Sequence, residues 1–194
     1  GYNGSDEAIA EGVLENPHVD RAFAMHVVST VPTGVIVYGE RPMAAAYNWK
    51  IVVEGVAGHG SMPDSCVDPA AHIHIGLQEI LAREISPMSE LVITCGAFNA
   101  GDAGNAIPQS ATMQGTIRVF DKKTEELAKK RITEIASGIA QTYRCAATTT
   151  FGRPSPAVFN DKEFMEQCVE YAKQTLPQVQ LYGSAHGMGS EDFG

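Results

Sequence analysis

The sequence has no long hydrophobic run and little positive charge. No segment approaches the roughly 20 consecutive apolar residues that a membrane-spanning helix needs, so we expect no membrane partner. Lys and Arg number 14 against 23 Asp and Glu, which gives a formal net charge of -9 over 194 residues. Because nucleic-acid backbones attract clustered basic side chains, this balance also argues against nucleic acid as a partner.

Cysteine is scarce and widely spaced. The four cysteines form no C-x-x-C pair: Cys66, Cys95, Cys145 and Cys168. The simplest interpretation is a reduced chain whose thiols pack as small apolar side chains. The first seven residues also lack the basic start and apolar core of a secretory signal. We therefore expect a cytoplasmic protein.

The segment 44–153 has the clearest secondary-structure pattern. Between Ala44 and Glu54 the large apolar side chains recur at every second position, which is the period of a half-buried strand. Further strands are predicted at 91–98, 110–120 and 145–151, and helices at 68–83 and 121–143. The order strand, helix, strand, strand, helix, strand predicts a ferredoxin-like (βαββαβ) domain, an antiparallel sheet with two helices on one face.

The flanking segments, 1–43 and 154–194, do not complete a domain of their own. Their patterns predict helices at 6–14 and 161–175 and strands at 21–28, 35–38 and 178–182. Too few elements are available to pair these strands into a full sheet. We therefore predict an α+β protein with one complete domain at 44–153 and flanking segments that lack partners in this chain.

Histidine is the first residue type to consider for chemistry. His26 lies near the end of the predicted strand at 21–28, where an imidazole is often a ligand or base, although a structural histidine fits equally well. His59 lies between two glycines, which permit close approach to another molecule, or it is an incidental surface residue of a turn. His72 and His74 point to different sides of a predicted helix, so they cannot chelate one ion together.

Two further polar residues lie in the second half of the segment 44–153. Asn105 ends a glycine-rich loop, and Arg118 lies near the end of the strand predicted at 110–120. An arginine there can bind a carboxylate through two parallel hydrogen bonds, and the alternative is a surface ion pair. The loop at 99–105 does not fit G-x-G-x-x-G and no G-K-[ST] follows, so no phosphate-binding loop is predicted.

Short motifs along nearly the whole chain resemble those of the two-metal amidohydrolases, a family that includes aminoacylases, hippurate hydrolases and auxin-conjugate hydrolases. Each motif is weak alone, but together they occur in the family's order and spacing. The motifs are Glu11-Gly12-Val13-Leu14, Ala24-Met25-His26-Val27, Pro32-Thr33-Gly34, Gly58-His59-Gly60-Ser61-Met62-Pro63, Asp68-Pro69, Asn105-Ala106-Ile107-Pro108, Gly115-Thr116-Ile117-Arg118 and Gly189-Ser190-Glu191-Asp192-Phe193.

The resemblance implies a metal-dependent hydrolase that releases an amino acid from an N-acyl amino acid or peptide-like conjugate. Its α/β zinc-peptidase-like catalytic domain would hold two divalent ions, Mn or Zn, with Co or Ni also suited to mixed His and carboxylate sites. The segment 44–153 would be a lid inserted into that domain, and it would pair two subunits as a homodimer. The catalytic domain would be represented only by 1–43 and 154–194.

The resemblance also assigns roles by position in the motifs. It implies that His26 is a metal ligand. His59 would be a catalytic residue that reaches the partner subunit's site and stabilises the oxyanion. Asn105 and Arg118 would contact the substrate carboxylate or the oxyanion, and Glu191 would border the active site as a substrate-binding residue.

The chain lacks the family's His-x-Cys-Gly-His-Asp-type segment and its Glu-Glu pair. One ligand, His26, cannot hold two ions. We therefore predict that the purified 194-residue polypeptide binds metal weakly and is inactive alone; appreciable hydrolysis of an N-acyl amino acid would contradict this. Two alternatives stay open: a non-catalytic dimerisation or binding module, and a dipeptidase or carboxypeptidase of the same architecture.

Overall fold

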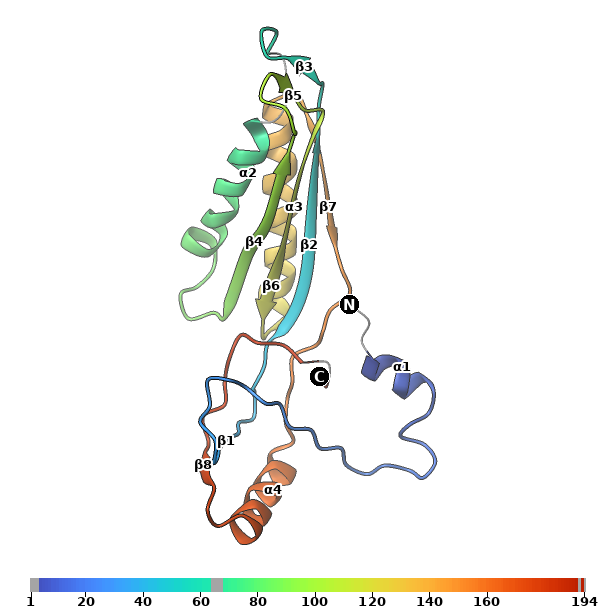
Figure 1. The fold of residues 1–194 in the computed structure, drawn as a ribbon, viewed down its shortest axis with the longest axis vertical. Helices are drawn as coiled ribbons and strands as arrows, with labels where there is room; N and C mark the ends of the chain where they lie inside the picture. The colour runs from blue at the N-terminus through green and yellow to red at the C-terminus, as the bar shows by residue number, and fades with distance from the viewer. Residues whose placement is uncertain (1–3, 64–67, 192, 194) are drawn as a thin grey trace. The chain divides into compact units, whose positions relative to one another are not determined.

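The computed structural model describes residues 4–63, 68–191 and 193, and the chain divides into two compact units (Figure 1). One unit is Ala46–Pro154. We call it the inserted unit. The other consists of Gly1–Ala45 and Ser155–Gly194, and we call it the flanking unit.

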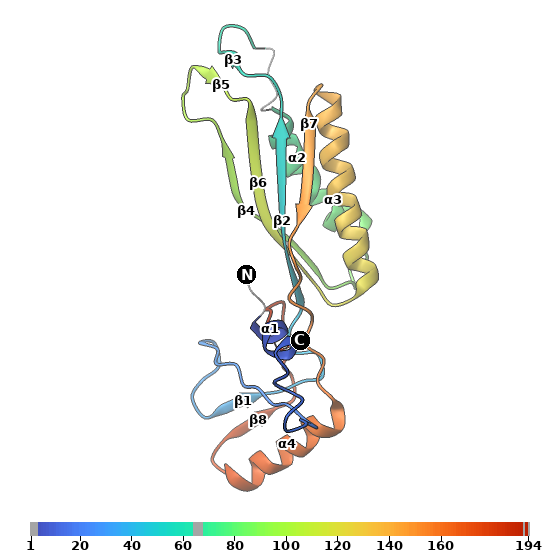
Figure 2. The same cartoon turned by 90° about the vertical axis from the view of Figure 1, so that its right-hand side faces the viewer.

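A four-stranded sheet with two helices on one face forms the inserted unit (Figure 2). The strands are β2 (Ala45–Glu54), β4 (Leu91–Ala100), β6 (Ser110–Val119) and β7 (Ala146–Phe151), and the helices are α2 (Asp68–Glu79) and α3 (Lys122–Thr142). The strand order is β4-β6-β2-β7, with β2 antiparallel to β7 and β4 antiparallel to β6. No helix in the described ranges is both long and apolar enough to cross a membrane.

The core of the inserted unit lies between the sheet and the helices. On β2 the side chains of Tyr47, Trp49 and Ile51 are buried, whereas Asn48 and Lys50 between them are exposed. This alternation confirms the strand that the sequence pattern predicts. Burying one such large apolar side chain contributes about 1.5–3 kcal/mol, so the face of β2 is fixed by the sequence itself.

Helix α3 begins where the sequence predicts. Asp121 is its N-cap, because a carboxylate oxygen of Asp121 accepts a hydrogen bond of 2.8 Å from the backbone N–H of Thr124. The buried positions of the helix follow the helical period, and half of them are alanines. Small side chains let the helix approach the sheet closely, while Ile135 and Ile139 lie against Gly76 of α2.

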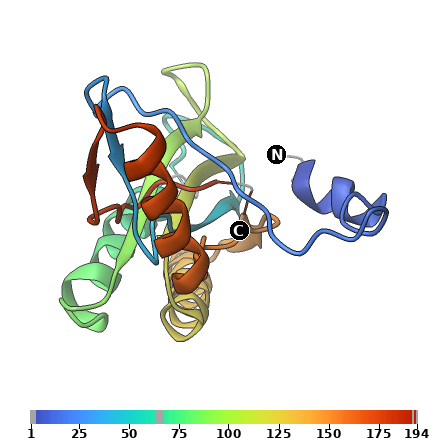
Figure 3. The same cartoon turned by 90° about the horizontal axis from the view of Figure 1, so that it is seen from below.

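A short parallel pair of strands anchors the flanking unit. β1 (Val35–Val37) pairs with β8 (Gln180–Tyr182), with Val35 opposite Gln180. Figure 3 shows this pair beside α4 (Lys162–Thr175). The unit also contains α1 (Gly4–Ala10). These elements lie within the ranges that the sequence pattern predicts, except that α1 begins two residues earlier and ends sooner.

The prediction of a strand at 21–28 is wrong. The chain runs there without regular structure between α1 and β1 (Figure 3). Its apolar side chains are turned to solvent, with Phe23 64%, Met25 68% and Val27 92% exposed. A strand needs a hydrogen-bonded neighbour, and no segment in the described part of the chain pairs with this one.

The expectation of four reduced thiols is also wrong. Cys95 and Cys168 are free, but Cys145 is disulfide-bonded. Cys145 lies between α3 and β7, the last strand of the inserted unit. Cys66 is outside the described residues. The wide spacing of cysteines along the sequence therefore did not exclude a disulfide.

Candidate functional site

Two predicted site residues, His59 and Asn105, meet at one end of the inserted unit. Two-residue strands bring them together: β3 (Gly58–His59) pairs antiparallel with β5 (Ala106–Ile107), at the same end of the unit in Figure 1. The backbone N–H of Gly60 donates a hydrogen bond of 3.0 Å to the carbonyl oxygen of Asn105. A Cβ on Gly60 would lie 3.2 Å from that oxygen, so glycine permits this close approach.

The hydrogen bonds of His59 fix its tautomer. Its Nδ1 lies 3.2 Å from the backbone nitrogen of Ser61 and 2.8 Å from the Ser61 hydroxyl. A backbone N–H can only donate, so Nδ1 accepts and the proton of the neutral imidazole is on Nε2. Nε2–H has no partner among the described residues, and the side chain is exposed. His59 therefore presents an N–H donor outward.

Arg118 lies far along the sheet from this pair. It is half-buried on β6, opposite Val92 of β4 and next to the last residue of β6. At about 3.3 Å per residue, it is roughly 25 Å along β6 from Ser110, the end nearest β5. The predicted residues of the inserted unit therefore occupy two places rather than one.

In the flanking unit, His26 and Glu191 are hydrogen-bonded. His26 Nδ1 lies 2.6 Å from Glu191 Oε2, and their side chains are 49% and 28% exposed. The sequence motifs predict a role for each residue, metal ligand for His26 and substrate contact for Glu191. The contact between them is not contained in either motif.

This pair fits one ligand position of a metal site. An imidazole nitrogen with a carboxylate on the opposite ring nitrogen is the usual environment of a histidine ligand. Within the described ranges, no cluster of three or more His, Cys, Asp or Glu side chains is placed to hold an ion. The described residues therefore offer part of a donor set, and the nitrogen available for it is Nε2 of His26.

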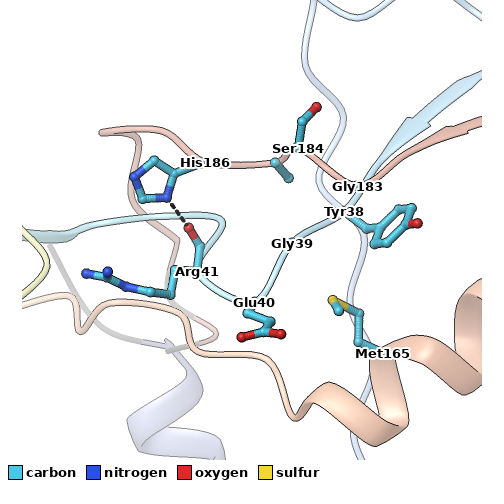
Figure 4. A pocket seen from close by; sticks show the side chains of 9 residues that line it. Tyr38, Gly39, Glu40, Arg41, Met165, Gly183, Ser184 and His186 are labelled. Carbon is cyan, nitrogen blue, oxygen red and sulfur yellow. Dashed lines mark hydrogen bonds between the residues drawn. The ribbon is translucent and has the colours of Figure 1, made fainter.

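A pocket of about 360 Å³ lies elsewhere in the flanking unit (Figure 4). It is lined by 38–41, by 183–186 and by Met165 of α4. Its wall depends on close backbone packing, since a Cβ on Gly39 would clash with the carbonyl oxygen of Ala185. His186 Nδ1 is hydrogen-bonded to the carbonyl oxygen of Arg41 at 2.8 Å. None of the predicted site residues lines this pocket.

One buried charged cluster in the inserted unit is structural. Glu125 is only 5% exposed, and Lys129 and Lys122 bond its carboxylate at 2.7 and 3.2 Å. Burial raises the pKa of Glu125, but hydrogen bonds from Lys129, Tyr47 and Lys122 outweigh it, so the pKa lies below its ordinary value. Burial and then Glu125 raise the pKa of Tyr47. Because the carboxylate of Glu125 is already bonded to Lys129, Tyr47 and Lys122, we assign this cluster no catalytic role.

Comparison with known proteins identifies relatives of the whole chain. The family profile described as the M20 peptidase dimerisation domain matches residues 45–144. An IAA-amino acid hydrolase (ILR1-like 2) of Arabidopsis thaliana is 32% identical over 201 residues, which cover 100% of this chain and 45% of the relative. The hippurate hydrolase of Campylobacter jejuni is 31% identical over 202 residues, covering 100% of this chain and 52% of the relative.

A solved structure extends the comparison to the fold. The YXEP protein of Bacillus subtilis, a dinuclear metal binding peptidase from the M20 family, matches with a TM-score of 0.75 and 28% identity over 97% of this chain and 47% of that one. The chain spans about half the length of these relatives. The resemblance drawn from the sequence motifs is confirmed: the chain belongs to the M20 family of amidohydrolases and peptidases and carries its dimerisation domain.

Proposed function

We propose that this chain is the lid-bearing part of an enzyme that hydrolyses the amide bond of an N-acyl amino acid or a similar conjugate and releases the free amino acid. Its relatives include an IAA-amino acid hydrolase and a hippurate hydrolase. The compound named in each is an N-acylated amino acid. The observation that carries the proposal is His59, which presents Nε2–H outward beside Asn105.

The inserted unit is proposed to be a ferredoxin-like lid at 44–153, set into a catalytic domain to which 1–43 and 154–194 contribute. The strand order β4-β6-β2-β7 and the two helices on one face support this arrangement. The exposed apolar side chains of Phe23, Met25 and Val27 suit packing against the remainder of that domain. The match to a dimerisation domain supports a homodimer formed through the lid.

Catalysis would rest on His59 as an electrostatic donor. Two divalent ions, when bound, supply Lewis acidity to the scissile carbonyl and a water of lowered pKa. His26 would contribute one ligand through Nε2. As the carbonyl oxygen gains negative charge, Nε2–H of His59 would donate to it. Asn105, whose backbone carbonyl accepts from Gly60, would supply a further donor through its side-chain amide. In a dimer this pair would serve the partner subunit's site.

Arg118 is proposed to bind the free carboxylate of the substrate. Because Arg118 lies roughly 25 Å along β6 from the end nearest His59, it would serve this chain's own site while His59 serves the partner subunit's. A charge-assisted pair contributes about 1.5–3 kcal/mol, so the complete protein should hydrolyse an N-acetyl amino acid about 10- to 100-fold faster, in kcat/KM, than the corresponding carboxamide. Arg118→Gln should abolish this preference. Arg83→Gln, a matched change at an exposed position of the inserted unit, should keep it.

Equal rates on the free and blocked substrates would contradict the role of Arg118. No hydrolysis of any N-acyl amino acid by the complete, metal-loaded protein would overturn the function itself. A carboxypeptidase is the second candidate, because a thermostable carboxypeptidase of Saccharolobus solfataricus is 32% identical over 198 residues. Peptides with a free amino terminus, included in the same panel, distinguish the two, since only the second candidate cleaves them.

A further inference from the structure

His26 lies in a loosely packed part of the flanking unit. The segment has no regular structure, and the neighbours Met25 and Val27 are 68% and 92% exposed. The ring itself is about half exposed, with 49% of the side chain accessible. The hydrogen bond from Nδ1 to Glu191, at 2.6 Å, is therefore the contact that orients this ring.

The chemistry of that contact decides which ring nitrogen can bind a metal. An ionised carboxylate only accepts hydrogen bonds, so Nδ1 of His26 carries the proton and donates to Glu191. A neutral imidazole has one N–H, which leaves a lone pair on Nε2. A metal ion binds only an unprotonated nitrogen. Glu191 thus leaves His26 ready to bind through Nε2.

His59 shows the opposite arrangement in the same chain. Its Nδ1 accepts from the backbone N–H of Ser61, which leaves the proton on Nε2. The group that faces Nδ1 is a carboxylate at His26 and an N–H at His59. The two histidines are therefore held in opposite tautomers, one with an outward acceptor and one with an outward donor.

We propose that Glu191 is a positioning residue that holds His26 in its metal-binding tautomer and orientation, rather than a substrate contact. One of its carboxylate oxygens is already committed to His26, and its side chain is 28% exposed. The inference rests on the proposed function only for the identity of His26 as a ligand. The tautomer follows from the hydrogen bond alone.

The first test reads the tautomers directly by long-range ¹H–¹⁵N NMR of protein labelled at histidine. His26 should show a protonated Nδ1, and His59 a protonated Nε2. Glu191→Ala should move His26 toward the Nε2-protonated form and leave His59 unchanged. His186, whose Nδ1 is hydrogen-bonded to the carbonyl oxygen of Arg41, reports that the flanking unit is folded. Glu166→Ala, a matched change at an exposed position of α4, should alter neither signal.

The second test measures Zn²⁺ binding to the complete protein by competition with a chelating dye. Carboxylates that orient a histidine ligand typically contribute 10- to 100-fold to metal affinity, so Glu191→Ala should weaken Zn²⁺ binding about 10- to 100-fold at unchanged stoichiometry. Glu191→Asp keeps the carboxylate on a shorter stem and should recover part of the affinity. Glu166→Ala should bind Zn²⁺ like the parent protein.

Two results would overturn this inference. An unchanged His26 tautomer and Zn²⁺ affinity in Glu191→Ala would show that Glu191 does not position the ring. Loss of one bound Zn²⁺ per chain, rather than weaker binding, would make Glu191 a ligand itself. Neither test measures turnover, so a protein that hydrolyses no N-acyl amino acid would remove the proposed function and leave the positioning role intact.

Discussion

Replacing His59 with alanine is expected to lower kcat of the complete enzyme by roughly 100- to 1000-fold, because one donor to the developing oxyanion is lost. The donor is the Nε2–H that the hydrogen bond from Ser61 directs outward. KM should change little, since this bond strengthens only as the carbonyl oxygen gains charge. Steady-state rates on an N-acetyl amino acid measure both constants.

Two variants make the result specific. His72→Ala is the matched control, because His72 is an exposed histidine of the same unit whose ring stacks on Tyr143 at 5.3 Å and takes no part in the proposed site. It should keep kcat within about twofold. His59→Gln retains an N–H donor on a more flexible stem and should fall between the parent and His59→Ala.

The same variant separates the catalytic lid from a non-catalytic module. Dimer content and bound metal should stay at parent levels in His59→Ala, because His59 is exposed and is hydrogen-bonded to the neighbouring Ser61. Loss of turnover with both unchanged supports a lid that takes part in the reaction. Parent-level turnover in His59→Ala would leave the inserted unit with a scaffold role only.

Local physics made most of the inserted unit predictable from the sequence. The faces of β2 follow from a period of two, and the start of α3 follows from a capping aspartate, Asp121. The segment 21–28 has an equally apolar sequence but forms no strand. A strand is a property of a pair of segments, so its own residues could not reveal whether a neighbour is present.

The contacts within the candidate site were harder to predict. His59 and Asn105 are joined by strands of two residues each, too short to show a period. His26 and Glu191 meet across 165 positions of sequence, and no local rule relates such positions. Only the bond between Ser61 and His59 had a local signal, since a Ser or Thr two residues away can reach the ring.

Gly115→Ala is expected to destabilise the inserted unit by about 3 kcal/mol, the upper end of the usual cost of overpacking. Gly115 lies on β6 opposite Cys95 of β4. A Cβ there would clash with the carbonyl oxygen of Thr94 and would lie 2.5 Å from the indole of Trp49, which is 2% exposed. Neither a strand carbonyl nor a buried indole can move aside cheaply.

Gly96→Ala on β4 is the matched control, because a Cβ at Gly96 would meet nothing within 4 Å and its φ is not in the left-handed region. It should be neutral or stabilising by up to about 1 kcal/mol, since alanine restricts the unfolded chain. Urea unfolding of both variants measures the difference, and equal midpoints would contradict the packing explanation. Gly115 stands three residues before Arg118 in the same motif. Any loss of carboxylate preference in Gly115→Ala would then follow from a displaced β6 rather than from a missing contact.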